Sequence, residues 1–211
     1  MSVSHENGLR ANPEESKGSS DVVKPSRGVV LWPDGSTNQV IRALWDGIEA
    51  HGVPSMATHS HKLHQPHVSL TVATHIPVRA ALEAVQPVPR APIRLLVEAA
   101  GAFPAEPPSG REGTYVVLFL ACVANTELIS EQRRVYDAIR PLAVGSWSHL
   151  EPATWTPHIT TVWALTPEQL ATVLPIVISK LPIKGWLDRG GVEDGRTGER
   201  WTSPEGLDSD L

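Results

Sequence analysis

Apolar positions along the chain follow two patterns, one typical of short buried strands and one typical of amphipathic helices. The strand-like runs are rich in β-branched residues and are bounded by proline, glycine or aspartate. They cover residues 28–32, 67–72, 93–99, 115–123, 158–165 and 183–187, and a last short strand lies near Trp201. Apolar residues at helical spacing predict helices that begin near Ser36 or Thr37, Pro77, Thr126 and Thr166. The order strand, helix, strand, helix, strand therefore occurs twice.

Proline and glycine predict where these elements end. Residues 101–113 are rich in Pro, Gly and Glu and predict a loop between the two repeats. The glycines of residues 190–198 predict a turn before the last strand. Pro175 lies inside the fourth helix, and we expect it to kink that helix or to end it early, because proline has no backbone N–H.

The repeated order predicts one α+β domain of two lobes. The repeats cover about residues 28–99 and 114–188, and the domain as a whole covers residues 27–203. Two similar units pack naturally about a pseudo-twofold axis. Residues 1–26 are polar and predict a disordered tail, and residues 204–211 predict a frayed end.

A short motif begins one strand of each repeat. The first copy is Pro66-His67-Val68-Ser69-Leu70, and the second is Pro157-His158-Ile159-Thr160-Thr161. Successive side chains of a strand point to opposite faces, so each histidine shares a face with the hydroxyl residue two positions later. Val68, Leu70 and Val72 should point to the core from the first strand, and Ile159 and Trp163 from the second. If the two strands meet, they form a cleft with two imidazoles and two hydroxyls.

Two imidazoles suit displacement at a phosphodiester. Imidazole titrates near neutral pH, so one histidine can act as a base while the other acts as an acid. The attacking and leaving oxygens lie on opposite sides of phosphorus, and each histidine would serve one of them. Hydroxyls at Ser69 and Thr160 can hydrogen-bond the non-bridging oxygens, where charge builds up. This chemistry requires neither a metal nor another cofactor.

The paired motifs and the repeated order of elements resemble the two-histidine (2H) phosphoesterase superfamily, and within it the 2′-5′ RNA ligase-like branch, which includes RNA 2′,3′-cyclic phosphodiesterases. The resemblance covers about residues 28–201. It implies a bilobal fold of antiparallel sheets lining a central cleft, with helices outside. It also implies that His67 donates a proton to the leaving sugar oxygen and His158 accepts one from water, while Ser69 and Thr160 bind phosphate.

The resemblance implies hydrolysis of a 2′,3′-cyclic phosphate of a nucleotide or RNA end to a 2′-phosphate, with 2′-5′ ligation in some members. Two features depart from the family pattern. Ser69 replaces the more usual threonine and keeps the hydroxyl. Thr161 replaces an aliphatic residue on the core face, where its hydroxyl needs a buried partner.

Composition and charge indicate where in the cell the protein acts and which partners it has. With 41% hydrophobic and 19% charged residues, the chain is typical of a soluble globular protein. No apolar run approaches the ~20 residues that span a bilayer, and no signal-peptide pattern precedes the domain. The single Cys122 excludes an intrachain disulfide. We therefore expect a cytoplasmic protein without a membrane partner. The net charge of −5 speaks against an extended nucleic-acid surface.

Three alternatives stay open. The chain could be a binding module of the same fold that holds a nucleotide or phosphate without turnover. His59, His61, His64 and His67 could bind a metal, although a polar loop without nearby carboxylates favours solvated histidines. Trp147 and Trp155 flank the second motif and are candidates for stacking on a base, or for packing in the core. The oligomeric state is not indicated by the sequence.

Overall fold

The computed structural model describes residues 26–205. The predicted disordered tail, 1–26, and the predicted frayed end, 204–211, therefore lie almost wholly outside the described residues. Within residues 26–205 the structure contains four α-helices and eight strands, with one short 3₁₀ turn at Ser148–Leu150. The predicted α+β class is confirmed.

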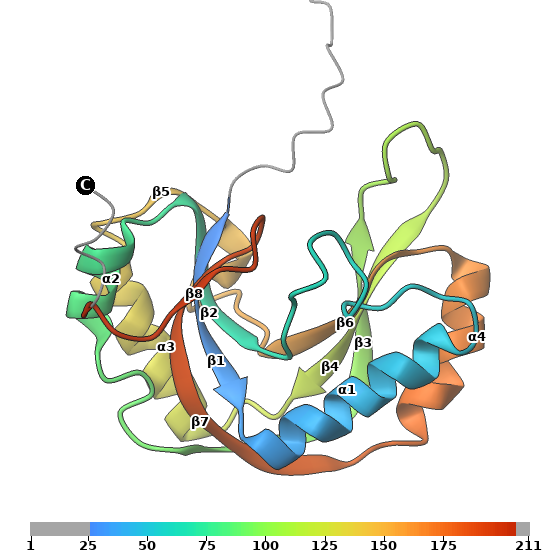
Figure 1. The fold of residues 1–211 in the computed structure, drawn as a ribbon, viewed down its shortest axis with the longest axis horizontal. Helices are drawn as coiled ribbons and strands as arrows, with labels where there is room; N and C mark the ends of the chain where they lie inside the picture. Colours follow the sequence, from blue (N-terminus) through green and yellow to red (C-terminus); the bar gives the residue numbers. More distant parts are fainter. Residues whose placement is uncertain (1–25, 206–211) are drawn as a thin grey trace, which may run out of the picture.

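All eight strands belong to one antiparallel sheet with the order β5-β2-β1-β7-β3-β4-β6, and β8 pairs with β7. The strands are β1 (Arg27–Pro33), β2 (Val68–His75), β3 (Ile93–Ala105), β4 (Tyr115–Cys122), β5 (Val144–Ser146), β6 (His158–Leu165), β7 (Ile183–Asp194) and β8 (Arg200–Trp201). The sheet is strongly curved and brings its distant strands toward each other (Figure 1).

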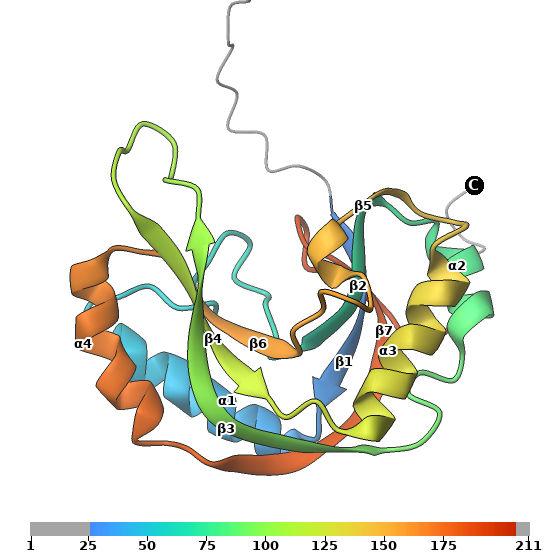
Figure 2. The same cartoon turned by 180° about the vertical axis from the view of Figure 1, so that it is seen from behind.

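The four helices form two pairs on opposite sides of the molecule. They are α1 (Gly35–Glu49), α2 (Val78–Val85), α3 (Thr126–Ile139) and α4 (Pro167–Ile178). Helix α1 packs against α4, and α2 packs against α3, as both views show (Figures 1 and 2). Each pair thus combines a helix from the first half of the chain with one from the second. No helix in the described part of the chain is long and apolar enough to cross a membrane.

Two strands are longer than the sequence predicts. Strand β3 continues through the first five residues of the predicted loop 101–113, and β7 continues through the predicted turn at Gly190 and Gly191. Both strands change partners along their length: β3 pairs first with β7 and then with β4, and β7 pairs first with β3 and then with β1. A Cβ at Gly191 would lie 2.2 Å from the Trp201 carbonyl oxygen. This glycine therefore permits close strand approach and does not mark a turn.

Both histidine strands contain an irregularity at the same place. Leu70 and Thr71 are consecutive buried residues of β2, and Thr161 and Val162 are consecutive buried residues of β6. The register of the neighbouring strand shifts at each site, which is typical of a β-bulge. The bulge reverses the alternation beyond it. Hence Val72 is only half-buried and Trp163 is 49% exposed, so the predicted core positions of these two residues are wrong.

Two helix predictions also need correction. Helix α4 continues through Pro175 to Ile178, so the predicted early end is wrong. Val173 and Val177 are completely buried on either side of this proline, and their packing stabilises the last turn. Helix α1 is capped by Asp34 and not by Ser36 or Thr37. The Asp34 carboxylate accepts hydrogen bonds from the backbone N–H groups of Ser36 and Thr37.

The Asp34 cap joins α1 to β7. Its Oδ2 accepts the backbone N–H of Trp186 at 2.8 Å and the Thr37 hydroxyl at 2.8 Å. Burial raises the pKa of this carboxyl, but the hydrogen bonds from Ser36, Thr37 and Trp186 outweigh burial and hold the pKa well below its usual range. The carboxylate is therefore charged throughout the neutral and mildly acidic range, and its hydrogen bonds persist there.

We expect Asp34→Ala to lower the free energy of unfolding by about 1–2 kcal/mol, because several backbone and hydroxyl donors lose their acceptor. Urea denaturation at pH 7 measures this change. Gln39→Ala, an exposed change in the same helix, serves as the control and should stay within about 0.5 kcal/mol of the parent. Equal stability of Asp34→Ala and the parent would contradict the role of the cap.

Candidate active site

His67 and His158 come from strands that are not neighbours in the sheet. His67 directly precedes β2, and His158 is the first residue of β6. Four strands separate β2 from β6 in the sheet order. Curvature nevertheless brings Cα atoms of β2 and β6 within 8 Å of each other. The two imidazoles are close enough that charge on His67 lowers the pKa of His158.

The same backbone contact orients both imidazoles. His67 Nδ1 lies 2.8 Å from the carbonyl oxygen of Gln65, and His158 Nδ1 lies 2.7 Å from that of Thr156. A carbonyl oxygen can only accept a hydrogen bond, so Nδ1 carries the proton in each ring. The Nε2 atoms have no hydrogen-bond partner within residues 26–205. Each Nε2 is thus available either as a base or, when protonated, as an acid.

The hydroxyl residues of the two motifs occupy equivalent positions. Ser69 and Thr160 are half-buried, and each follows its histidine by two residues. Neither hydroxyl makes a hydrogen bond with another group in the described part of the chain. The hydroxyl of Thr161, in contrast, is fully buried and donates to the Leu118 carbonyl at 2.8 Å. The buried partner that Thr161 was expected to need is therefore present.

His158 lies against two aromatic rings. The ring centroids of Phe103 and Phe119 are 5.1 and 5.2 Å from that of His158, and the two phenyl rings stack at 4.1 Å. Burial lowers the pKa of His158, its hydrogen bond with Thr156 raises it, and charge on His67 and His149 lowers it further. The net pKa is below the ordinary value of 6.5, so His158 is neutral at pH 7.

His67 has a different environment. Its Nδ1 lies 3.8 Å from Oε1 of Glu193, whose side chain is only 4% exposed, while the side chain of His67 is 24% exposed. The second carboxylate oxygen of Glu193 accepts a hydrogen bond from Trp32 Nε1 at 3.2 Å. No carboxylate of the described chain forms a comparable ion pair with His158. The two histidines therefore share their orientation but not their electrostatic surroundings.

The two tryptophans of the second motif are placed differently. Trp155 packs against the core, and its indole N–H donates to the carbonyl oxygen of Ser69 at 2.9 Å. This bond joins the segment before β6 directly to β2. Trp147 is 36% exposed, and its ring centroid lies 5.5 Å from that of His149.

Sequence patterns did not indicate Phe103, Phe119 or Glu193. Phe103 lies in the part of β3 that was predicted as a loop, and Phe119 lies in a continuous apolar run that gives no sign of which face meets a site. One usable signal was Gly101, which pairs with Phe119 across the sheet. A Cβ at Gly101 would lie 2.4 Å from the Phe119 ring, so glycine lets that ring cross the strand.

The other histidines before β2 form a separate cluster. The His64 ring centroid lies 4.0 Å from that of His61 and 5.6 Å from that of His59, and His59 lies 6.2 Å from Trp163. His64 is buried, so the expectation of a solvated loop is wrong for this residue. Within residues 26–205, no three His, Cys, Asp or Glu side chains are arranged to hold a metal ion.

The chain matches no known family model and no curated protein. Several solved structures are similar to it, and two of them are structures of the same protein. The structure of Usb1 from Kluyveromyces marxianus is 11% identical, with a TM-score of 0.44, and the match covers 84% of this chain and 97% of Usb1. The structure of the same protein with uridine monophosphate is 12% identical, with a TM-score of 0.45 and coverages of 86% and 98%. Similarity at this level leaves the functional assignment to the residues of the site.

We expect the imidazole of His158 to titrate below its ordinary pKa and His67→Ala to raise that pKa, because the substitution removes a neighbouring positive charge. Histidine NMR titration measures both values. His75→Ala, at the exposed end of β2, is the control and should leave His158 unchanged. An unshifted His158 in the His67→Ala protein would show that the two rings do not interact.

The buried His64 predicts a loss of stability in acid. Burial, followed by charge on His61 and His59, lowers the pKa of His64 to about 3 in the folded protein. The unfolded chain binds this proton near pH 6.5, so the free energy of unfolding should fall as the pH drops below 6.5. By pH 5 the loss is about 2 kcal/mol. Denaturation at several pH values should show a weaker pH dependence for His64→Gln and an unchanged one for His51→Gln.

Proposed function

We propose that this protein is a metal-independent phosphodiesterase that opens 2′,3′-cyclic phosphates of nucleotides or RNA ends to 2′-phosphates. One observation supports the proposal above all. Two histidines with the same backbone-fixed tautomer stand at the start of two strands that meet, and each has a hydroxyl two residues away. Among residues 26–205, neither the Nε2 atoms nor these hydroxyls have a hydrogen-bond partner. This arrangement supplies two proton-transfer groups and two phosphate-binding groups.

In the proposed reaction, water attacks phosphorus and the bond from phosphorus to the 3′-oxygen breaks. His158 Nε2 accepts a proton from the water, and His67 Nε2–H gives a proton to the departing 3′-oxygen. The products are a 2′-phosphate and a free 3′-hydroxyl, and solvent returns the two histidines to their starting states. Ser69 and Thr160 donate hydrogen bonds to the non-bridging oxygens, whose negative charge grows in the transition state.

The environments of the two histidines agree with these roles. A base must be neutral at the working pH, and burial against Phe103 and Phe119 lowers the pKa of His158. If a ribose 5′-hydroxyl takes the place of water, the same two transfers produce a 2′-5′ linkage. The proposal therefore includes 2′-5′ ligation as a second outcome of the same chemistry.

We expect His67→Ala and His158→Ala each to lower kcat by about 10²–10⁴-fold, because each removes one general acid–base group. Phosphorus NMR of a nucleoside 2′,3′-cyclic phosphate follows the reaction and identifies the product as a 2′- or 3′-phosphate. His75→Ala, an exposed histidine on β2, should keep the parent activity. A chelator should have no effect on the rate.

Three results would contradict the proposal. Tight binding of a 2′-nucleotide without turnover would indicate a binding module of the same fold. Loss of activity with a chelator would indicate metal-dependent chemistry. Full activity in both alanine variants would place the reaction elsewhere in the protein.

A further inference from the structure

Glu193 is a buried carboxylate next to one of the two proposed catalytic histidines. It lies near the end of β7 and is 4% exposed. Within residues 26–205 its carboxylate contacts the Trp32 indole N–H, at 3.2 Å from Oε2, and His67 Nδ1, at 3.8 Å from Oε1. Trp32 supplies a neutral hydrogen bond, so among the described residues His67 is the group within ion-pair distance of this carboxylate. A buried charge costs free energy unless it is paired, so a carboxylate at this position needs a partner such as His67.

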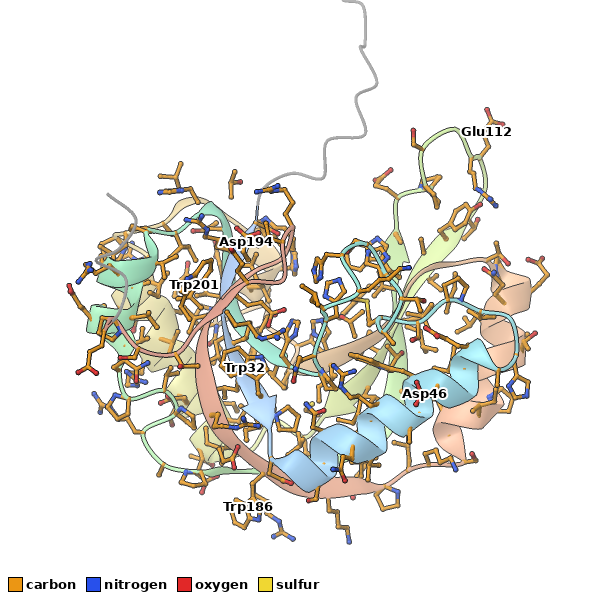
Figure 3. The ribbon with its side chains drawn as sticks, viewed as in Figure 1. Trp32, Asp46, Glu112, Trp186, Asp194 and Trp201 are labelled. Carbon is orange, nitrogen blue, oxygen red and sulfur yellow. The ribbon has the colours of Figure 1, made fainter. Side chains whose placement is uncertain are left out.

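The sheet register directs Glu193 toward the site. Glu193 lies opposite Gly28 of β1, and Ser69 of β2 lies opposite Val30 of the same strand. Directly paired residues point to the same face of a sheet, and residues two apart in a strand share a face. Glu193 and Ser69 therefore point to one face, together with Trp32 of β1, which is labelled in Figure 3.

A glycine makes room for the indole that binds Glu193. A Cβ at Gly191 would lie 3.1 Å from Cη2 of Trp32, so the indole lies directly over this glycine. The indole is 5% exposed and donates its N–H to Glu193 in a buried setting. Glu193 is thus held in place by a hydrogen bond that does not depend on the state of His67.

Three titratable groups face His67: the Glu193 carboxylate of β7, and His158 of β6 and His64 of the preceding loop, two imidazoles whose pKa values burial lowers. A guanidinium is also nearby, because Arg200 of β8 lies directly opposite Glu193 in the sheet. His158 and His64 are neutral at pH 7, and the Arg200 guanidinium donates a hydrogen bond to the Leu63 carbonyl, so Glu193 is the carboxylate that faces His67. A carboxylate within about 4–6 Å favours the protonated form of a histidine, and the low dielectric of a buried site strengthens this attraction.

We propose that Glu193 is a positioning residue that holds His67 as an imidazolium and so makes His67 the general acid of the reaction. The inference rests on the proposed phosphodiesterase function for its catalytic part, and on the apo protein alone for its electrostatic part. Without Glu193 the two motifs would differ mainly in the aromatic rings around His158. With it, a buried carboxylate faces one histidine and aromatic rings face the other.

The test compares Glu193→Gln with the parent enzyme over a range of pH. Glutamine keeps the size of the side chain and an acceptor for Trp32, but it removes the charge. Because the acid must be protonated, kcat/KM decreases as the pH rises. In the variant this decrease should begin at a lower pH than in the parent enzyme. We expect roughly a tenfold loss at pH 8 and less than a twofold loss at pH 6. In the apo protein, NMR should show the His67 imidazole losing its proton at lower pH.

Two further variants complete the design. Asp188→Asn removes one negative charge from an exposed position of the same strand and should leave both the rate profile and the His67 titration unchanged. Glu193→Asp keeps the charge on a shorter side chain and should retain part of the activity at pH 8. If Glu193→Gln does not fold, Glu193→Asp tests the pairing through distance, because its shorter side chain moves the carboxylate away from His67 without removing the charge.

The outcomes separate the two proposals. An inactive parent enzyme would overturn the phosphodiesterase function, and the NMR titration would still test the pairing of Glu193 with His67. An unchanged His67 titration in Glu193→Gln would overturn the pairing even if the enzyme is active. A loss of activity that is equal at every pH would show that Glu193 only supports the fold, and would also overturn the inference.

Discussion

The site depends on one physical constraint, the approach of two strands that share no hydrogen-bond ladder. Four strands lie between β2 and β6 in the sheet, so the curvature of the sheet must bring these two strands together. The sheet curves along the long strands β3 and β7, because each of them pairs with one strand over its first part and with another over its second part. The bond from the Trp155 indole to the Ser69 carbonyl then joins the two regions directly. Since each histidine stands at the start of its strand, the imidazoles come together where the strands meet.

Two nearly identical motifs acquire different properties from what lies beside them. In both, a carbonyl two residues earlier fixes the proton on Nδ1, which is a local effect of the motif itself. Beyond that contact the surroundings diverge: phenyl rings pack on His158, and a buried carboxylate faces His67. Acid–base pairs in enzymes need environments that separate their proton affinities. Here neighbouring strands supply that difference, and the repeated motif supplies the shared geometry.

The local pattern of the sequence was enough to predict the order of elements and the α+β class, and the motifs led to the histidines that the structure places together. It failed where a distant contact overrides a local rule. Gly190 and Gly191 indicate a turn by composition, yet neighbouring backbone and Trp32 take up the space that side chains would need. Val72 and Trp163 follow bulges that no period-two pattern reveals. Phe119 and Glu193 reach the site only through register between strands far apart in the chain.

The histidine cluster beside the site is shaped by the same electrostatics. His59, His61 and His64 lie in the loop that leads to His67, and positive charge on them would repel an imidazolium there. Burial lowers the pKa values of His59 and His64, and charge on His61 lowers both further, so these two rings are uncharged near pH 7. The cluster can therefore pack against Trp163 and shape the loop without opposing the attraction between Glu193 and His67. The loop next to His67 can hold several histidines because burial keeps the rings of His59 and His64 from binding protons near pH 7.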